Sequence, residues 1–334
     1  MRSVNRQWLL ASRPQGPVEE SNFQLVEKEV PAPGDGEVLV RVHYLSLDPY
    51  MRGRMDDARS YAPCQPLGEV MIGGTVGEVV ESRNPRWSKG DLVVGMGGWQ
   101  EWFTSDGKGL IPVQRGLPES VYLGAVGMPG ITAWYGLYRI GKPKEGETVV
   151  VSAASGAVGS VVGQLAKMRG CRAVGVAGGP AKCEHVVKDL GFDACIDYKA
   201  ADFRERFKAA VPGGIDVVFE NVGGAVLEAS LARMNAFGRI ALCGIIAGYG
   251  GQDVSLRNVR SLLVNRLLVQ GFIVAEHLEI WPEAMKELGA AVAAGKIKYR
   301  ETVAQGIHSA PRAFMGLLRG ENLGKQLVKM DVSG

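Results

Sequence analysis

The segment Val149–Gly159, with the sequence VVVSAASGAVG, decides the predicted fold of this chain. Three valines are followed by a turn that contains Gly156 and Gly159, and then by a helical pattern of apolar residues. A buried parallel strand, a tight turn and a helix N-terminus make a pyrophosphate site, because free backbone N–H groups and the helix dipole both favour an anion. We therefore predict nucleotide binding. Since Ala154 replaces the first glycine of the G-x-G-x-x-G pattern, close helix–strand packing is the alternative explanation.

The end of the next strand indicates which nucleotide is bound. Arg172–Val176 is a second β-branched run, and it completes a strand–helix–strand unit. A site for NAD carries an acidic residue about 20 residues beyond the glycines, which falls here at Val176. Residues 177–181 contain no carboxylate, and the next charged residue is Lys182. A cation without an acidic neighbour favours a 2′-phosphate, so we predict NADP(H). A solvent-exposed lysine at a helix start is the alternative interpretation of Lys182.

Length and composition limit the other possibilities. The 334 residues predict two domains, and a net charge of +3 without a dense basic run gives no reason to expect a nucleic-acid partner. The five scattered cysteines form no C-x-x-C pair, so neither a disulfide framework nor a structural zinc lobe is predicted. No segment resembles a secretory signal or a membrane span, and we expect a cytoplasmic protein with no membrane partner.

The first 125 residues or so predict a β-rich domain, in which short apolar runs alternate with glycine and proline turns. A small barrel is expected, because closure hides the strand edges. Residues 45–52, with the sequence LSLDPYMR, are too polar and proline-broken to be another core strand. There, Tyr50 and Arg52 either line a cleft or serve as loop packing and an ion-pair residue. The expected strands are Glu37–Val42, Gly74–Val80, Asp91–Val94 and Glu101–Thr104.

A helical segment from Ile131 to Tyr138 follows the sequence GMPG at 127–130, and we place the change of domain there. Met128 is either a core filler or a pocket wall. Strands and helices then alternate, which predicts a doubly wound parallel sheet that binds ligands at the carboxyl ends of its strands. Its six expected strands are Thr148–Ser152, Arg172–Val176, Ala194–Asp197, Ile215–Glu220, Arg239–Gly244 and Leu267–Val274.

Four candidate sites stand where these strands end: Tyr198, Asn221, the segment Cys243–Tyr249, and Phe272–Val274. The amide of Asn221 can hydrogen-bond a ribose or a nicotinamide carboxamide, or it can simply form the turn before two glycines. Near the C-terminus, the run 321–328 is expected to add a closing strand to the N-terminal barrel.

Five motifs together carry a resemblance to a known family. They are DPYMR (48–52), GMPG (127–130), AASGAVGSVVGQLAK (153–167), ENVGG (220–224) and ENLGKQLV (321–328). In this order, and over almost the whole chain, they resemble the zinc-independent medium-chain dehydrogenase/reductases. The most similar branch contains the prostaglandin/leukotriene, curcumin and plant double-bond reductases.

The resemblance implies a GroES-like β-barrel catalytic domain, residues 1–126 completed by 298–334, and a Rossmann NADP-binding domain, residues 127–297. It implies NADPH-dependent reduction of a carbon–carbon double bond conjugated to a ketone or aldehyde, and a homodimer. It assigns the pyrophosphate to Gly156, Ala157, Val158 and Gly159, and the 2′-phosphate to Lys182 and Tyr198. The remaining cofactor residues that it implies are Asn221, Cys243, Gly244, Ile245, Tyr249, Phe272, Ile273, Val274 and Asn322.

Zinc-dependent relatives need a set of Cys, His and Glu ligands, and this chain has Asp48 where the first cysteine is expected. His43, Cys64 and Glu69 do not complete a set, so we predict no catalytic metal. The chain also departs from the family in the fifth-strand loop, which often contains Tyr-Asn, whereas Tyr249 is followed here by Gly250 and Gly251. The shape of that loop and the choice of substrate therefore stay open.

Without zinc, hydride transfer to the β-carbon of an enone leaves an enolate that only hydrogen bonds can stabilise. Tyr249 is the candidate catalytic donor, and the alternative is that it only forms a wall of the pocket. Tyr50, Arg52 and Met128 are the candidate substrate-binding residues. Two rival functions remain: an NADPH:quinone oxidoreductase, and an NADP(H)-binding sensor without turnover.

Overall fold

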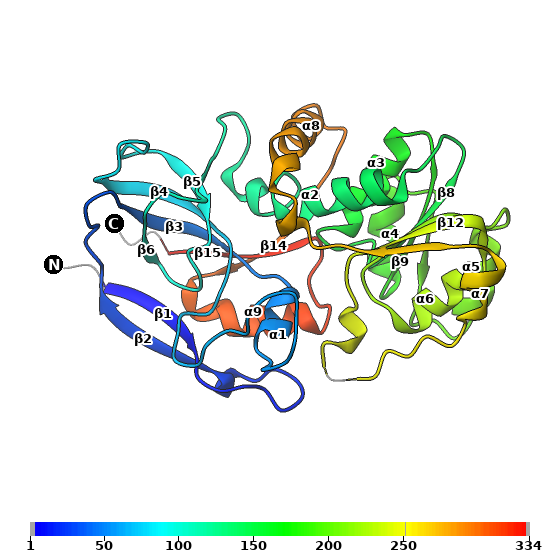
Figure 1. Ribbon diagram of the computed structural model, residues 1–334, viewed down its shortest axis with the longest axis horizontal. Coiled ribbons are helices and arrows are strands. Elements are labelled where there is room, and N and C mark those ends of the chain that lie inside the picture. Colours follow the sequence, from blue (N-terminus) through cyan, green and yellow to red (C-terminus); the bar gives the residue numbers. More distant parts are fainter. Residues whose placement is uncertain (1–3, 251, 332–334) are drawn as a thin grey trace. The chain divides into compact units, whose positions relative to one another are not determined.

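The computed structural model describes residues 4–250 and 252–331. The chain divides into two compact units (Figure 1). Unit 1 contains Met1–Leu123 and Glu301–Gly334, and unit 2 contains Gly124–Arg300. Gly251, which the sequence analysis marks as a departure from the family, lies outside the described residues.

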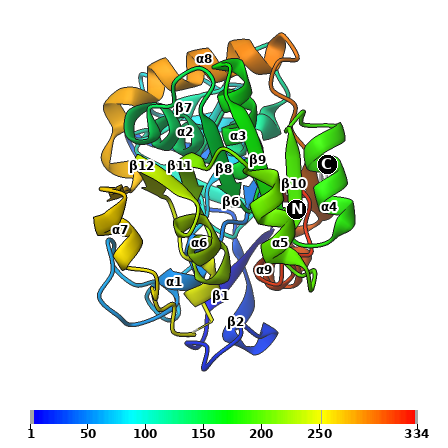
Figure 2. The ribbon, with the colours of Figure 1, turned by 90° about the vertical axis from the view of Figure 1, so that its right-hand side faces the viewer.

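Unit 2 is built on a parallel sheet of six strands in the order β10-β9-β8-β11-β12-β13. The chain starts in the middle at β8, adds strands toward β10, and then returns to the other side of β8 with β11. Figure 2 shows β12, β11, β8, β9 and β10 side by side in this order. The predicted doubly wound sheet is confirmed. The strands are β8 (Thr148–Ser152), β9 (Arg172–Ala177), β10 (Ala194–Asp197), β11 (Ile215–Glu220), β12 (Met234–Leu242) and β13 (Leu268–Gly271).

Helices cover both faces of this sheet, because its strands are apolar on both sides. Val150 and Val218 join the apolar cluster that contains Phe203 and Phe207 of α5 and Leu231 of α6. Figure 2 shows α2 and α3 above the strands, with α5 and α6 below them. The helices of unit 2 are α2 (Met128–Tyr135), α3 (Gly159–Met168), α4 (Pro180–Lys188), α5 (Phe203–Ala210), α6 (Gly224–Leu231), α7 (Arg260–Val264) and α8 (Trp281–Ala293).

Several bounds in unit 2 differ from those expected, and strand β9 extends one residue further, to Ala177. The helix expected from Ile131 begins at Met128, with Pro129 in its first turn, and continues as a π-helical stretch over Gly136–Gly141. Strand β12 begins at Met234, before Phe237, which takes a positive φ of 64°. Strand β13 ends at Gly271, so Phe272–Val274 lie after the sixth strand, where the sequence analysis made them its end.

Unit 1 carries a seven-stranded sheet in which β3 is central, since it pairs with β15, β4 and β6. The predicted closing strand is confirmed: β15 pairs antiparallel with β3, and Leu327 faces Ser46 in this register. A two-stranded sheet of β1 and β2 completes the strands. They are β1 (Val4–Leu10), β2 (Phe23–Glu29), β3 (Val38–Ser46), β4 (Thr75–Ser82), β5 (Leu92–Gly95), β6 (Trp102–Ser105), β7 (Ile111–Pro112), β14 (Glu301–Gln305) and β15 (Lys325–Lys329).

Three aromatic rings form the centre of the unit 1 core. Phe23 stacks on Trp99 with centroids 5.1 Å apart, and Phe314 of α9 (Ala310–Leu318) meets both rings edge-on. Such edge and stacked contacts add to the apolar area that the rings bury. The core therefore joins the N-terminal strands to a helix that lies near the end of the chain.

The segment 45–52 is more regular than predicted. Strand β3 continues through Leu45 and Ser46, because β15 supplies a hydrogen-bonding partner there. Helix α1 (Tyr50–Arg54) then begins directly after Pro49, whose φ of −59° and ψ of −30° are already helical. Met51 is fully buried, so this short helix packs into the unit 1 core.

Candidate functional site

The turn after β8 has the shape that an anion site requires. Ala153 takes a positive φ of 49°, which starts the turn. A Cβ at Gly159 would lie 2.4 Å from the Ala153 carbonyl oxygen, so only glycine fits there. Among residues 4–250 and 252–331, no acceptor is found for the backbone N–H groups of Ala157, Val158 and Gly159. These donors stand at the N-terminus of the ten-residue helix α3, where an anion is favoured.

Strands β8 and β11 are the neighbours at which the order of strand addition reverses, and both end in one hydrogen-bonded cluster. The Ser152 hydroxyl, at the end of β8, donates to Glu220 Oε1 at the end of β11, with 2.7 Å between the oxygens. The same oxygen accepts the backbone N–H groups of Val222 and Gly223 at 2.6 and 2.8 Å. Glu220 is fully buried, and burial raises its pKa against these hydrogen bonds. Ser152 and Glu220 were missed as site residues, although Glu220 heads the ENVGG motif.

Asn221 is held by this cluster. Its backbone N–H donates to the Ser152 hydroxyl at 2.7 Å, and its side-chain amide donates to the Ser152 carbonyl oxygen at 2.8 Å. The amide is therefore fixed in direction at the switch point of the sheet, where doubly wound folds bind their ligands. Asn221 thus lies in the turn before the two glycines, and its binding to the cofactor stays a prediction.

The loop after β12 lies against the same cluster. The backbone N–H groups of Cys243 and Gly244 both donate to the Glu220 carbonyl oxygen, at 2.8 and 3.1 Å. Burial, and then the charge of Glu220, raises the pKa of the Cys243 thiol to about 12, so this thiol is not a nucleophile near neutral pH. Tyr249 follows the short 3₁₀ turn Ile246–Gly248, and its hydroxyl lies 3.8 Å from where a Cβ of Gly244 would be.

A second polar group lies at the ends of β9 and β10. A Cβ at Gly178 would lie 3.0 Å from the Tyr198 ring and 3.2 Å from the Lys199 side chain, so these side chains cover that glycine. Burial lowers the pKa of Lys182, and the nearby charge of Lys199 lowers it further. Two ammonium groups and a phenol thus gather where the sequence analysis expected a phosphate. Lys199 was missed, although it directly follows Tyr198.

Asp197, a carboxylate beside this group, is already engaged. Asp197 Oδ1 accepts the backbone N–H groups of Gly179 and Lys199, at 2.8 and 3.0 Å. These two hydrogen bonds lower the pKa of Asp197, and the carboxylate holds the turn before α4. Its role is therefore to fix the backbone around Lys182.

The residues after β13 pack inside unit 2. The Phe272 ring contacts Tyr135 at 5.5 Å and Phe219 at 6.2 Å between centroids. Val274 is buried, and Ile273 lies between Phe272 and Val274 in the chain. Met128 is the first residue of α2 in the same unit.

Unit 1 contains the other predicted site residues. Arg52 is 4% exposed, and it pairs with Asp56 at 2.6 Å while donating to the Gly16 carbonyl at 3.2 Å. Burial, and then the charge of Asp48, raises the pKa of Tyr50. The side-chain amide of Asn322 donates to the Gly324 carbonyl at 2.8 Å.

A buried ion pair lies beside Tyr50. Lys325 Nζ contacts Asp48 Oδ1 at 2.7 Å and the Leu47 carbonyl at 2.6 Å, and the Ser46 hydroxyl also donates to Asp48. Both charged side chains are less than 10% exposed. The pair joins the loop after β3 to β15, and it was missed because its members are far apart in the sequence.

The residues considered as metal ligands are used in other contacts. His43 Nδ1 lies 2.9 Å from Glu119, and Cys64 contacts Arg13 and Asp57. In the part of the chain that the structure describes, no three His, Cys, Asp or Glu side chains gather where they could hold a metal ion.

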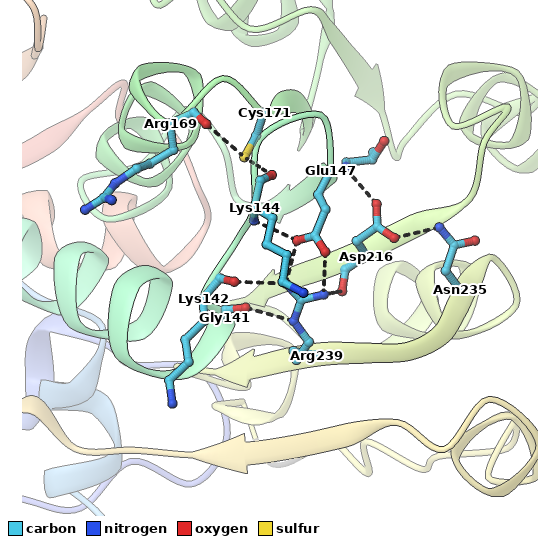
Figure 3. A network of polar contacts seen from close by, with 10 residues as sticks. Gly141, Lys142, Lys144, Glu147, Arg169, Cys171, Asp216, Asn235 and Arg239 are labelled. Carbon is cyan, nitrogen blue, oxygen red and sulfur yellow. Dashed lines mark hydrogen bonds and ion pairs between the residues drawn. The ribbon is translucent and has the colours of Figure 1, made fainter.

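A cavity of about 400 Å³ lies at the opposite edge of the unit 2 sheet, where the strands begin. Its wall contains Arg239, whose five N–H groups are distributed over Glu147 and the carbonyl oxygens of Gly141, Lys142 and Asp216 (Figure 3). The Arg239 ion pair helps to lower the pKa of Glu147, against burial. Because every donor of Arg239 is used within the protein, this cluster ties the strand starts together, and Arg239 has no donor left for a ligand.

Comparisons with known proteins agree with this division of the chain. Residues 6–113 match the family described as the N-terminal domain of oxidoreductase, and residues 157–290 match the family described as zinc-binding dehydrogenase. The chain is 47% identical to the NADPH-dependent curcumin reductase of Escherichia coli, over 98% of this chain and 97% of the relative. It is 41% identical to the NADP(+)-dependent 2-alkenal reductase of Nicotiana tabacum, over 97% of each.

A solved structure has the same fold. The crystal structure of CurA from Vibrio vulnificus in complex with NADPH superposes with a TM-score of 0.93. It is 46% identical to this chain, and the match covers 98% of this chain and 99% of the other.

Proposed function

This chain belongs to the zinc-independent medium-chain dehydrogenase/reductases, in the branch of the curcumin, prostaglandin and plant double-bond reductases, and we propose that it uses NADPH to reduce enones. The substrate class is the α,β-unsaturated ketones and aldehydes, and the bond reduced is the conjugated carbon–carbon double bond. We infer the reaction class from the relatives. Lys182 of α4 and Lys199 after β10 are the basis for the cofactor preference.

The residues of unit 2 fit the cofactor. The N–H groups of Ala157, Val158 and Gly159 lie at the start of α3 and have no acceptor in the described residues, so they are available to a pyrophosphate. Lys182, Tyr198 and Lys199 supply two charges and a hydroxyl for a 2′-phosphate. When bound, NADPH supplies the hydride. We assign the cofactor-binding domain to residues 127–297, and the catalytic domain to residues 1–126 with 298–334.

Asn221 and the loop after β12 orient the nicotinamide end in this proposal. The Ser152–Glu220 cluster fixes the Asn221 amide, and the backbone carbonyl of Glu220 supports the loop that leads to Tyr249. Cys243, Gly244 and Ile245 line that end with backbone atoms, and Phe272–Val274 and Asn322 complete the predicted cofactor contacts. Tyr249 donates a hydrogen bond to the enolate oxygen that forms when the β-carbon accepts hydride, which lowers the barrier at that step. Tyr50 and Met128 contact the substrate, and Arg52, which Asp56 and the Gly16 carbonyl hold, supports Tyr50 from the same helix α1.

An acceptor screen tests the reaction. Purified protein is given NADPH with an enone, an alkenal or a quinone, and NADPH oxidation is followed while the products are identified. Saturated ketone or aldehyde products from the first two acceptors, with slower turnover of the quinone, are expected. Faster turnover of the quinone would assign a quinone oxidoreductase, and tight NADPH binding without any turnover would assign a sensor.

A homodimer forms through β13 in this proposal. This strand ends the sheet, and its four residues Leu268–Gly271 are all exposed. Exposed apolar side chains continue beside it at Phe237, Leu263 and Val264. An unpaired, apolar sheet edge invites pairing with a second copy by strand addition. Sedimentation of wild-type protein and of a Val269→Lys variant tests this, and a monomeric wild type contradicts it.

We also propose that the protein resides in the cytoplasm. All five cysteines are free thiols in the structure, which suits a reducing compartment. Among the described residues, no helix has the length and apolar character to cross a membrane. Cell fractionation with thiol labelling before lysis tests the compartment.

A further inference from the structure

Two cysteine side chains meet beside the predicted phosphate site. Cys183 lies in the first turns of α4, directly after Lys182, and Cys195 lies in β10. Helix α4 packs against β10, and this packing brings the two thiols within interaction range of each other. Gly175 of β9 lies beside Cys195 and Val186 of α4, since a Cβ there would lie 3.3 Å from the Cys195 sulfur and 3.0 Å from the Val186 side chain. Both residues are partly exposed, so a small oxidant can reach them.

The surroundings make the two sulfurs unequal. The hydrogen bond with Cys195 lowers the pKa of Cys183, against burial, while the same bond and burial raise the pKa of Cys195. Asp197 opposes ionisation of Cys183, and Arg206 of α5 favours it. The Cys183 thiol therefore ionises more readily than the Cys195 thiol. This is the arrangement of a reactive cysteine with a resolving partner.

We propose that Cys183 and Cys195 are a modification site, at which a hydroperoxide converts the two thiols into one disulfide that weakens NADPH binding. The Cys183 thiolate attacks the O–O bond of hydrogen peroxide, which gives a sulfenic acid and hydroxide. The Cys195 sulfur then displaces the sulfenic hydroxyl, and its proton leaves with it as water. In total, two thiols are oxidised to a disulfide and one peroxide is reduced to two waters.

The disulfide acts on the cofactor through Lys182. The two sulfurs must approach to about 2 Å to form the bond. The first turns of α4 therefore shift toward β10, and Lys182 moves with its neighbour Cys183. A charge-assisted hydrogen bond to phosphate depends steeply on distance, so NADPH loses affinity while NADH, which lacks that phosphate, changes less. This second step depends on the proposed NADPH preference, but formation of the disulfide does not.

The test uses the full-length protein, reduced and then exposed to hydrogen peroxide. Peptide mapping without reductant is expected to find a cross-link between Cys183 and Cys195. The NADPH dissociation constant, from fluorescence titration, is expected to rise roughly three- to tenfold, and dithiothreitol should restore it. Cys183→Ser and Cys195→Ser should each abolish both effects. Cys64→Ser, a partly exposed cysteine of unit 1, should leave both unchanged.

Two results would overturn the proposal: free thiols or a lone sulfinic acid at Cys183 after peroxide, or a cross-link that leaves NADPH affinity unchanged. Should a serine variant not fold, the cross-link map and titration of the wild type decide alone. If the reduced wild type binds NADPH and NADH equally, the proposed cofactor preference fails, and the cross-link map still reports on the thiols.

Discussion

Removal of the Lys182 ammonium group should weaken NADPH binding far more than NADH binding. Lys182 is partly buried beside Lys199, and burial and the charge of Lys199 both lower its pKa. The free protein therefore holds two repelling cations, and a phosphate relieves this repulsion. A hydrogen bond between charged groups contributes about 1.5–3 kcal/mol, and tenfold in affinity corresponds to about 1.4 kcal/mol. Lys182→Met, which keeps most of the apolar stem, should thus raise the NADPH dissociation constant by roughly 10- to 150-fold.

The assay titrates each variant with NADPH and with NADH, at two ionic strengths. Lys199→Met should show a smaller loss in the same direction, and the double variant should lose less than the sum of the two free-energy changes, since both lysines contact one phosphate. Lys208→Met, an exposed lysine in the last turn of α5, is the matched control. Higher salt should reduce the difference between the cofactors. Equal losses for NADPH and NADH would refute the phosphate role of Lys182.

Three further predictions concern the catalytic rate and the stability of the fold. Tyr249→Phe should lower kcat for an enone by roughly 10²- to 10³-fold with little change in NADPH affinity, and an unchanged rate across pH would make Tyr249 only a pocket wall. Burial raises the pKa of Glu220 above its value in the unfolded chain, so wild-type stability should fall as pH rises between those two values. In urea titrations, the unfolding free energy of Glu220→Gln should not fall over this pH range. Parallel pH profiles of unfolding free energy for the variant and the wild type would contradict the prediction. Lys325→Met leaves a buried Asp48 charge and should cost about 3–5 kcal/mol of unfolding free energy, most of which Asp48→Asn should restore if the pair is the cause.

The strands of unit 2 were predictable because their sequence pattern is local. Strands β8, β10 and β11 have the expected bounds, since each is a short apolar run between turn-forming residues. The predicted bounds of β12 and β13 were wrong, and the reason is visible in β12. Phe237 takes a positive φ inside β12, and no simple pattern predicts that conformation for a phenylalanine.

The contacts that define the site were less predictable, because they join distant parts of the chain. Ser152 meets Glu220 only because β8 and β11 are neighbours, with Val151 opposite Phe219 in the parallel register. The sequence contains both residues but not the order of the strands. The same holds for Asp48 and Lys325, which the pairing of β3 with β15 brings together.

The two edges of the unit 2 sheet show why unsatisfied donors locate a site better than the size of a cavity does. At the amino edge, a cavity of about 400 Å³ is lined by Arg239, but all of its donors have acceptors within the protein. A ligand there would have to break these bonds before it formed its own. At the carboxyl edge, the N–H groups of Ala157, Val158 and Gly159 find no acceptor in the described residues. An anion at the carboxyl edge gains these hydrogen bonds without displacing any, whereas a ligand beside Arg239 gains none until it breaks existing ones.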